Sequence, residues 1–458
     1  MQTTLSPIDN SVYLERECAT PAQVDAGLGE ALAAQRAWRE TSLQQRQAQL
    51  LSCLDYFRQQ RDDIAREICC QMGRPIAYAG GEIGGLLERA EYMIDIAPDA
   101  LADVDVGEKE GFRRFIRREP LGVVAIVAPW NYPFLTACNG IFPALLAGNA
   151  VVLKHSSQTP LAAERFAAAF ASAGLPVGLF QCFHLPHADT EALLADPRVD
   201  YVNFTGSVPA GHRIQEAISG KFINAGLELG GKDPAYVRAD ADLAFAVENL
   251  VDGAFFNSGQ SCCGIERIYV HTALYAEFVE RFAALVREYR LGDPLDPQTT
   301  LGPMVRPSAS DFVRGQIADA LAAGAKALVD ESAFPASQPG SAYLAPQVLV
   351  DVDHSMRVMT EESFGPVVGI MPVASDDEAL TLMNDSEFGL TASIWSRDID
   401  AALALGDRVE TGTLFVNRCD YLDPALSWTG VKNSGRGCTL SSVGYEVLTR
   451  PKSFHARL

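Results

Sequence analysis

The sequence predicts an α/β fold divided into two or three packed domains. Short runs of β-branched and other apolar residues alternate with alanine-rich helical segments over 122–207, and the alternation returns over 227–417. This pattern is typical of parallel sheets whose two faces are covered by helices. The chain has 458 residues, of which 48% are hydrophobic, so it is too long for one simple core and too apolar to be disordered.

The first hundred residues are predicted to be mainly helical. From Pro21 to Met93, Ala, Leu, Gln and Arg recur at helical spacing, which indicates several amphipathic helices. The next segment, 111–122, mixes charged with apolar residues and closes on Pro-Leu-Gly, which predicts an exposed hairpin strand.

Two series of strands and helices follow. The first is expected to have strands at 122–129, 149–154 and 199–207, with helices up to Leu146 and over 161–174. The second is expected to have strands at 227–237, 267–271, 390–396 and 412–417, with helices in the 240s, over 275–289 and over 401–409. The Pro- and Ser-rich segment 332–342 predicts a surface loop. The basic, strand-like end, 448–458, could pair with 111–122 in an arm outside both main domains.

Composition excludes several classes of protein. The charge is −21, from 37 Lys and Arg against 58 Asp and Glu, which disfavours binding to nucleic acid or to an anionic membrane. No leader-like start and no run of about 18 apolar residues is present, so no membrane segment is expected. The adjacent pairs Cys69/Cys70 and Cys262/Cys263 suit a reducing compartment, and we expect the cytoplasm. Without a CxxC or HExxH motif, no metal site is expected.

Chemistry is indicated by four motifs, most of them at the ends of predicted strands. They are APWNYP at 128–133, FTGS at 204–207, LELGGK at 227–232 and FFNSGQSCC at 255–263. In this order and spacing they closely resemble the aldehyde dehydrogenase superfamily. The resemblance extends to KHSSQTP at 154–160, EESFGPV at 361–367, GTLFVN at 412–417 and GVKNSGRG at 430–437. The common dinucleotide fingerprint is absent, because GGEIGG at 80–85 follows no predicted strand.

The resemblance implies three structural parts. They are a Rossmann-type cofactor domain (1–105 and 121–230), an α/β catalytic domain (231–440) and a small β oligomerisation arm (106–120 and 441–458). Because unpaired strand edges invite pairing, the arm implies a homodimer or a homotetramer.

Three residues are expected to carry the reaction. Cys262 follows a Gly-Gln turn, and although an isolated cysteine is more often structural, the resemblance makes its thiolate the nucleophile and leaves Cys263 to pack. Glu228 lies among apolar residues and could be paired with a cation, but the resemblance makes it the general base for water, with a pKa raised by burial. Asn131 could cap a helix beginning near Pro133, whereas the resemblance makes its amide, with the Cys262 N–H, an oxyanion hole.

A dinucleotide is expected to bind to residues of several motifs. Lys154 could be a solvated strand-end charge, but the resemblance directs it to the adenosine ribose or its phosphate. The spacing of Ser207 and Gly211 suggests a helix start whose free N–H groups bind pyrophosphate, with a plain helix cap as the alternative. Glu362 and Phe364 match the contacts to the nicotinamide ribose and ring. The expected cofactor-binding residues are Pro129, Trp130, Lys154, Ser157, Thr205, Gly206, Ser207, Leu229, Gly230, Glu362 and Phe364.

The cofactor is expected to be NAD or NADP. Many NAD-preferring members of the superfamily carry a Glu three residues after this Lys, where the present chain has Ser157. Without that carboxylate nothing repels a 2′-phosphate, and Lys154 would attract it. NADP is therefore expected to be accepted, and a preference for it is left open.

The substrate pocket is predicted to combine aromatic and polar residues. Asn139 occupies a position that is often aromatic, and Arg418 either binds a substrate carboxylate or pairs with Asp420. The aromatic members could form a box around an apolar aldehyde. The pocket residues are Tyr132, Asn139, Phe256, Arg418, Leu422 and Trp428.

The resemblance implies oxidation of an aldehyde to its carboxylic acid with NAD(P)+. The expected route passes through a thiohemiacetal and a thioester on Cys262, and Glu228 favours hydrolysis, because members that transfer the acyl group to coenzyme A generally lack this residue. An acid semialdehyde such as succinate semialdehyde is one alternative substrate, beside aliphatic and aromatic aldehydes. A cofactor-independent cysteine esterase or thioesterase, and a binding protein that has lost the chemistry, are the alternatives from other classes.

Overall fold

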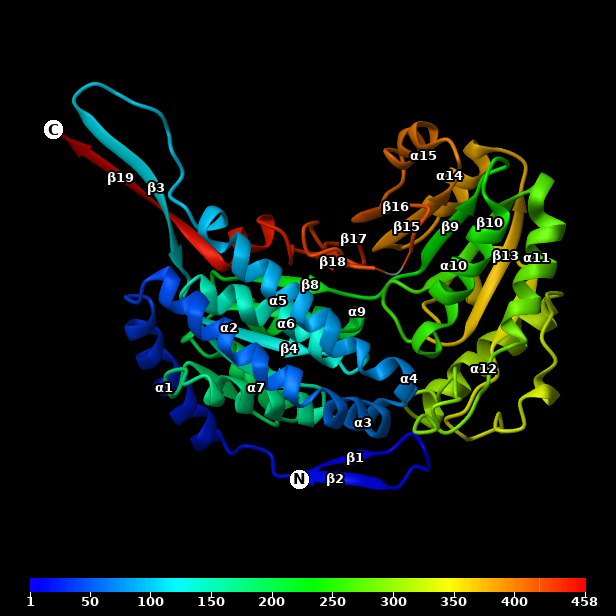
Figure 1. Ribbon diagram of the computed structural model, residues 1–458, viewed down its shortest axis with the longest axis horizontal. Helices are drawn as coiled ribbons and strands as arrows, with labels where there is room; N and C mark the ends of the chain where they lie inside the picture. Colours follow the sequence, from blue (N-terminus) through cyan, green and yellow to red (C-terminus); the bar gives the residue numbers. More distant parts are fainter. Residues whose placement is uncertain (420) are drawn as a thin grey trace.

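The computed structural model describes residues 1–419 and 421–458, and it contains two mainly parallel sheets, each in its own lobe (Figure 1). The first sheet has six strands in the order β18-β8-β7-β4-β5-β6, and only the edge strand β18 is antiparallel to its neighbour. Its strands are β4 (Val123–Ala128), β5 (Ala150–His155), β6 (Phe180–Cys182), β7 (Val199–Thr205), β8 (Asn224–Glu228) and β18 (Gly435–Arg436). The predicted α/β fold class is confirmed.

Helices surround this sheet, and the predicted helical N-terminal region is confirmed. Helices α1 and α6 pack against the central strands β4 and β5, and α2 and α5 pack on α6 as an outer layer. The helices are α1 (Pro21–Trp38), α2 (Leu43–Gln59), α3 (Arg61–Met72), α4 (Ile76–Ala79), α5 (Gly81–Ala100), α6 (Pro133–Leu146), α7 (Pro160–Ser172), α8 (His187–Ala195) and α9 (Val208–Ile218). Strands β4 and β5 are buried along their whole length. Their sequences are accordingly continuous apolar runs, apart from Lys154 and His155 at the end of β5.

The second sheet has seven strands in the order β11-β12-β13-β10-β9-β15-β16, and β11 alone is antiparallel to its neighbour. Its strands are β9 (Asp233–Val237), β10 (Ile265–His271), β11 (Lys326–Ala327), β12 (Gln347–Val350), β13 (Val367–Val373), β15 (Thr391–Trp395) and β16 (Thr413–Val416). Its helices are α10 (Leu243–Phe255), α11 (Thr272–Val286), α12 (Pro307–Ala322), α13 (Arg357–Thr360), α14 (Asp376–Asn384) and α15 (Ile399–Gly406). The predicted second strand–helix series is confirmed except at 227–237. This segment is not a single strand, because it contains the end of β8 in the first sheet and the whole of β9 in the second.

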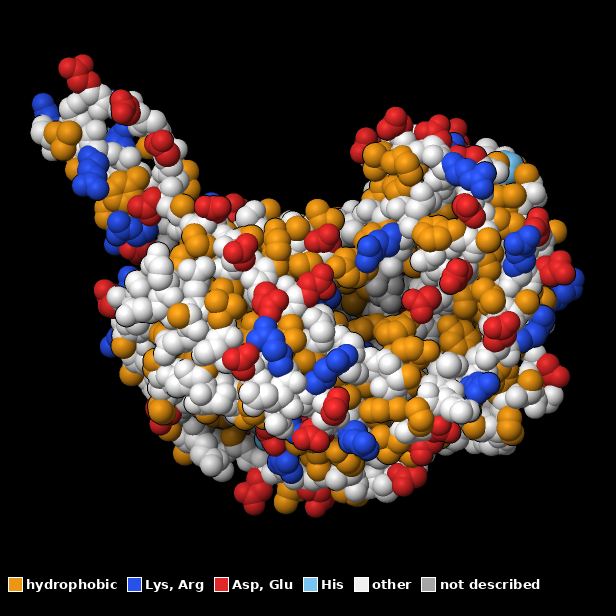
Figure 2. Space-filling model, viewed as in Figure 1, with side chains coloured by type: hydrophobic (Ala, Val, Ile, Leu, Met, Phe, Trp, Pro, Cys, Tyr) orange, Lys and Arg blue, Asp and Glu red, His pale blue; other side chains and the backbone are white. Residues whose placement is uncertain are grey.

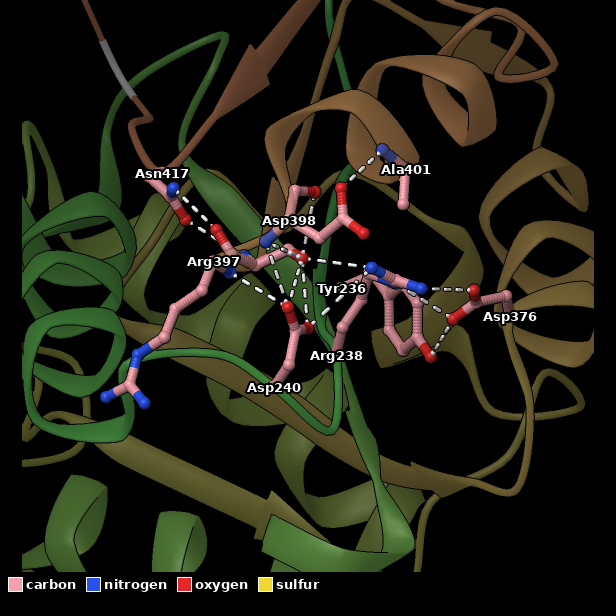
Figure 3. Close-up of polar contacts among 9 residues, drawn as sticks. Tyr236, Arg238, Asp240, Asp376, Arg397, Asp398, Ala401 and Asn417 are labelled. Carbon is pink, nitrogen blue, oxygen red and sulfur yellow. Dashed lines mark hydrogen bonds and ion pairs between the residues drawn. The ribbon is translucent and has the colours of Figure 1, made fainter.

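A network of charged side chains fastens the loops that follow β9 and β15 (Figure 3). Arg238 donates to Asp376 from Nη2 at 2.8 Å, and the Asp240 carboxylate accepts the backbone N–H groups of Arg397 at 3.1 Å and Asp398 at 3.0 Å. These carboxylates are therefore occupied in holding loops at the carboxyl edge of the second sheet. The amino ends of β9 and β10 lie at its opposite edge.

The predicted arm is formed by the segment at 111–122 and the C-terminal segment, as expected from the sequence. Strand β3 (Phe112–Pro120) runs antiparallel to β19 (Thr449–Arg457) in an unbroken register, and the two project from the body (Figure 1, Figure 2). Its predicted strand character is confirmed, but its partner is the C-terminal strand rather than a neighbour in sequence. Phe115 stacks on Phe454 with ring centroids 4.6 Å apart. The domain boundaries given above stay predictions.

Short elements complete the fold. They are the hairpin of β1 (Gln2–Leu5) and β2 (Val12–Arg16), the pair β14 (Phe388–Gly389) and β17 (Val431–Lys432), and the 3-10 turns η1 (Phe256–Gly259), η2 (Glu331–Ala333) and η3 (Val443–Leu448). Within the described residues, no helix is both long enough and apolar enough to cross a bilayer. The same part of the chain has no cluster of three or more His, Cys, Asp or Glu side chains suited to a metal ion.

Candidate active site

The motifs gather where β8 of the first sheet leads into β9 of the second. The adjacent parallel strands β8, β7, β4 and β5 end side by side, and the carboxyl edge of such a sheet is where ligands bind. Glu228 is the last residue of β8 and Thr205 is the last residue of β7. A Cβ on Gly231 would lie 2.4 Å from the Cys262 carbonyl oxygen, so the loop before β10 packs directly on this junction.

A cavity of about 310 Å³ opens at this junction. It contains Cys262 and Glu228 together with most of the predicted pocket. Its lining residues are Arg74, Tyr78, Gly81, Glu82, Gly85, Glu88, Arg89, Tyr132, Leu135, Thr136, Asn139, Thr205, Glu228, Asp252, Phe256, Ser261, Cys262, Cys263, Tyr421, Leu422 and Trp428. Side chains from distant parts of the sequence therefore surround the thiol that the sequence singles out.

The two neighbouring cysteines differ in their surroundings. Cys262 is partly exposed to the cavity, whereas Cys263 is 3% exposed and its sulfur lies 3.5 Å from the hydroxyl oxygen of Ser261. The loop before them is unusual, because Asn257 and Ser258 have φ values of +54° and +57°. Left-handed backbone at two successive non-glycine residues is costly, and such strain is often found at functional sites.

Asn131 does not cap α6, so that alternative is wrong. The N-cap residue is Tyr132. The backbone N–H groups of Phe134 and Leu135 instead donate hydrogen bonds to the Glu82 carboxylate, at 2.9 Å and 3.2 Å. The Asn131 side chain is 6% exposed and donates one N–H to the Gln260 carbonyl at 3.2 Å. Its amide is thereby fixed against the loop that carries Cys262.

Arg74 ties these segments together, and no sequence motif indicated it. This arginine follows α3, is 2% exposed, and forms a buried ion pair with Glu82. It also donates to the backbone carbonyl of Asn131 at 2.6 Å and to the side-chain oxygen of Asn257 at 3.0 Å. A planar guanidinium suits this role, because its several donors fix several acceptors at once.

Glu228 is buried, and no described Lys or Arg forms an ion pair with it. The alternative that Glu228 is paired with a cation is therefore wrong for the described residues. Its side chain accepts a hydrogen bond from the Thr439 hydroxyl at 2.6 Å and another from the Thr205 hydroxyl at 3.0 Å. Burial raises the pKa of Glu228, and the two hydroxyl donors, followed by the charge of Arg89, act in the opposite direction because they stabilise the carboxylate. Thr439 had no motif around it that marked it as a partner of Glu228.

Arg74 and Arg89 line the cavity, and Arg418 does not. Arg89 lies on α5, is 8% exposed, and donates from Nη1 to the Asn139 side-chain oxygen at 3.1 Å. The Arg418 guanidinium lies over the Tyr421 ring, 3.7 Å from its centroid, and is not among the cavity's lining residues. The alternative partner of Arg418, Asp420, lies outside the described residues. The other predicted pocket residues, Tyr132, Asn139, Phe256, Leu422 and Trp428, line the cavity.

The expected adenosine end of the cofactor site lies after β5. Lys154 is 6% exposed, its Nζ donates no hydrogen bond to any described residue, and burial lowers its pKa. A largely buried lysine side chain with no hydrogen-bond partner among the described residues fits a site that an anion completes. Ser157 is exposed, and its carbonyl accepts a hydrogen bond from the Thr4 hydroxyl at 2.8 Å.

The expected pyrophosphate position is the start of α9. Thr205 and Gly206 lead into Ser207, which is the N-cap residue of this eleven-residue helix, and no side chain caps its first N–H groups. A Cβ on Gly211 would lie 2.8 Å from Leu229, so the glycine lets α9 approach the loop after β8. The free N–H groups and the helix dipole both favour a phosphate there.

The expected nicotinamide end lies on the loop before β13. Glu362 accepts the Gly231 N–H at 2.9 Å, and burial followed by the charge of Glu266 raises the pKa of Glu362 to about 7. A Cβ on Gly230 would lie 2.5 Å from the Glu362 carboxylate, so a side chain there would displace that carboxylate. Gly230 and Gly231 thus let the Glu362 carboxylate lie directly against the backbone.

Phe364 is held in a strained position on the same loop. Its φ is +52°, and its N–H and that of Ser363 both donate to Glu266 at 2.8 Å. Its ring meets Trp130 edge to face, with centroids 5.7 Å apart, where Pro129 and Trp130 follow β4. The sequence motif indicated Phe364 but gave no sign of the buried Lys232–Glu266 pair that fixes it.

Comparison with known proteins agrees with this arrangement. The profile described as "Aldehyde dehydrogenase family" matches residues 2–454. The succinate-semialdehyde dehydrogenase [NADP(+)] of Mycobacterium avium is 34% identical over 98% of this chain and 95% of that relative. A second relative, named succinate-semialdehyde dehydrogenase [NADP(+)] 1, from Mycobacterium tuberculosis, is 35% identical over 96% of both chains.

Solved structures agree as well. The succinic semialdehyde dehydrogenase from Streptococcus pyogenes, in complex with NADP+, superposes with a TM-score of 0.95 at 29% identity, covering 100% of both chains. The NADP-dependent glyceraldehyde-3-phosphate dehydrogenase from Bacillus halodurans, complexed with NADP, has a TM-score of 0.93 at 31% identity, covering 100% of this chain and 95% of that one. Proteins with different aldehyde substrates thus share this fold, so the substrate has to be argued from the cavity.

Proposed function

Because the chain belongs to the aldehyde dehydrogenase family, and is an oxidoreductase that converts an aldehyde to its acid with NAD or NADP, we propose that its substrate is a small semialdehyde bearing a carboxylate. The observation that carries the chemistry is the single cavity lined by both Cys262 and Glu228. The similarity to relatives named succinate-semialdehyde dehydrogenases supports the substrate class.

The proposed reaction begins at Cys262. Its thiolate attacks the aldehyde carbon, and the Asn131 amide and the Cys262 N–H donate to the oxygen that becomes negative. Glu362 and Phe364 would hold the nicotinamide riboside, which would supply the acceptor for the hydride that this carbon loses, so that the acyl group would remain on Cys262 as a thioester. Glu228 then takes a proton from water as the water attacks the thioester, so the acid departs and the thiolate is restored. Arg74 acts through Asn131 as a positioning residue.

The dinucleotide would be held along the carboxyl edge of the first sheet. Lys154 and Ser157 would face the adenosine ribose, the start of α9 the pyrophosphate, and Glu362 and Phe364 the nicotinamide riboside. The structures of relatives with bound NADP support NADP as an accepted cofactor. The binding surface between these points would be completed by Pro129, Trp130, Thr205, Gly206, Ser207, Leu229 and Gly230.

Assembly and location are part of the same proposal. The β3–β19 arm is a two-stranded sheet with a half-buried aromatic stack, and among the described residues no strand pairs with the outer edge of β19. This open edge supports a homodimer or a homotetramer joined through the arm. The two sheets and the β3–β19 arm support the division into a cofactor domain, a catalytic domain and an arm, although β18 of the first sheet lies within the proposed catalytic range 231–440. The adjacent thiols of Cys262 and Cys263 suit the reducing cytoplasm.

The substrate proposal is tested by steady-state kinetics on matched aldehydes. We expect the wild-type protein to oxidise succinate semialdehyde with a kcat/KM at least about tenfold above that for butanal, which has the same chain length without the charge. With either substrate, NADP should give a kcat/KM at least equal to that with NAD. Benzaldehyde serves as the aromatic control. A preference for butanal or benzaldehyde over succinate semialdehyde would contradict the carboxylate-bearing substrate class.

Substituting Thr439 tests how Glu228 is held. In Thr439→Val the carboxylate loses one of its two hydroxyl donors, so the pKa of Glu228 should rise and the base should ionise only at higher pH. We expect the ascending limb of the pH profile for thioester hydrolysis to move to higher pH, and the rate near pH 7 to fall about tenfold. Thr439→Ser should restore both. A slower enzyme with an unshifted pH profile would mean that Thr439 acts only on packing.

A further inference from the structure

We propose that Arg89 binds the substrate carboxylate, on a helix face that it shares with two glycines. This inference rests on the proposed function and names the residue that would select the substrate. Three arginines, Arg74, Arg89 and Arg418, lie in or near the segments that form the cavity, and their contacts divide them into one available cation and two that are engaged elsewhere.

Arg89 has the properties of an incomplete anion site. Its side chain is nine-tenths buried at the cavity wall, yet no described carboxylate lies within ion-pair distance of it. Its contacts are to neutral oxygens, since Nη1 donates to Asn139 at 3.1 Å and to the Leu135 carbonyl at 3.4 Å. A guanidinium has five N–H donors, so most of them stay available. The charge of Arg89 acts on the Glu228 carboxylate, but the two groups are not in ion-pair contact. The buried guanidinium therefore has no direct carboxylate partner, and a bound carboxylate would offset the cost of burying it.

The other two arginines are committed elsewhere. Arg74 lines the cavity, but its guanidinium is paired with Glu82 and hydrogen-bonded to the backbone of Asn131. Its charge is therefore already balanced by a carboxylate of the protein. Arg418 lies over the Tyr421 ring and does not line the cavity. Among the described lining residues, Arg89 is therefore the cation that can accept a carboxylate.

The glycine-rich segment 80–85 lies at the start of α5, the helix that carries Arg89. Gly81, Gly85 and Arg89 are four residues apart, so they share one face of the helix, and all three line the cavity. A Cβ on Gly81 would meet no atom within 4 Å, whereas a Cβ on Gly85 would lie 2.8 Å from the Leu135 side chain. The cavity is therefore open at Gly81, and Gly85 lets Leu135 pack against α5 one turn before Arg89.

Asn139 fixes the direction of the guanidinium. It is 2% exposed, lies on α6, and accepts from Nη1, so the remaining Arg89 donors are turned away from it. A long or aromatic side chain at 139 would compete with Arg89 for this space. The pair therefore works as one unit supplied by two neighbouring helices.

The test compares Arg89→Met with Arg418→Met on succinate semialdehyde and butanal. We expect Arg89→Met to lower kcat/KM for succinate semialdehyde about 10- to 100-fold, mainly through KM, and to lower it far less for butanal. The ratio of the two kcat/KM values should therefore collapse in Arg89→Met and stay within about twofold of wild type in Arg418→Met. A wild-type ratio in Arg89→Met, or a collapsed ratio in Arg418→Met, would overturn the assignment.

Two further measurements keep the outcome clear. If the wild-type protein shows no preference for succinate semialdehyde, the proposed function is wrong. If the wild-type protein has this preference and Arg89→Met retains it, only the assignment of Arg89 is wrong. If Arg89→Met does not fold, Asn139→Ala is used, and succinate is tested as an inhibitor of butanal oxidation. Succinate should inhibit Asn139→Ala at least about fivefold more weakly than wild type, and equal inhibition would overturn the role of the pair.

Discussion

The substitution Cys262→Ala is expected to lower aldehyde oxidation to less than about one-thousandth of the wild-type rate, whereas Cys263→Ala is expected to retain at least about a third of it. The two residues are neighbours, so the pair of variants separates chemistry from general damage to the loop. Cys262 faces the cavity, but Cys263 is 3% exposed and part of the core. Without the thiol no thiohemiacetal forms, and the remaining groups cannot release the hydrogen from the aldehyde carbon.

The measurement is the formation of reduced nicotinamide, supported by labelling with iodoacetamide. Iodoacetamide should modify one cysteine rapidly in wild type and in Cys263→Ala, and should lose that rapid phase in Cys262→Ala. Thermal unfolding checks that each variant is folded. If Cys263→Ala were the inactive variant and Cys262→Ala the active one, the nucleophile would have to be reassigned.

Local sequence pattern predicted the sheets and the edge at which ligands bind. Buried strands such as Val123–Ala128 are continuous apolar runs, and the motif residues Glu228 and Thr205 stand at the ends of their strands. The C-terminal strand could also be matched with the segment at 111–122, because both are basic and strand-like, and the register of β3 with β19 confirms that pairing.

The residues that sequence could not assign act across long separations. Arg74 and Arg89 line the cavity, and Thr439 donates a hydrogen bond to Glu228. None of the three belongs to a motif, and their roles depend on which atoms the fold places within bonding distance. For Arg418, by contrast, the sequence suggested a role at the cavity that the structure does not support. Its place in the loop before the motif at 430–437 suggested a carboxylate ligand, but stacking on Tyr421 directs its guanidinium elsewhere.

Fixed positions around the thiol explain why these distant residues matter. Asn131 and Asn257 are both bonded to Arg74, and Asn257 has left-handed backbone, so the loop before Cys262 is held in a conformation that it would not adopt alone. An oxyanion site is effective only when its donors are already in place. In the proposed mechanism, the buried Arg74–Glu82 pair acts by fixing the positions of Asn131 and Asn257.

The substitution Glu228→Gln separates the two halves of the reaction. The new amide would keep the shape of the side chain, and its oxygen could still accept a hydrogen bond from Thr439 or Thr205, but an amide cannot take a proton from water. We expect Glu228→Gln to form reduced nicotinamide in a rapid burst of about one equivalent per active site, followed by a steady rate lowered about 100- to 10,000-fold. Intact-protein mass spectrometry should then detect one acyl group on Cys262.

The contrast with Cys262→Ala makes this result decisive for the order of steps. Loss of the thiol removes the burst as well as the steady rate, whereas loss of the base should remove only the steady rate, because Glu228 acts after the thioester has formed. The Thr439→Val variant should lie between, with a full burst and a steady phase that recovers as pH rises. A Glu228→Gln protein that is folded but gives no burst would place Glu228 before thioester formation, as the base that deprotonates Cys262. An unchanged steady rate would assign the activation of water to another group lining the cavity.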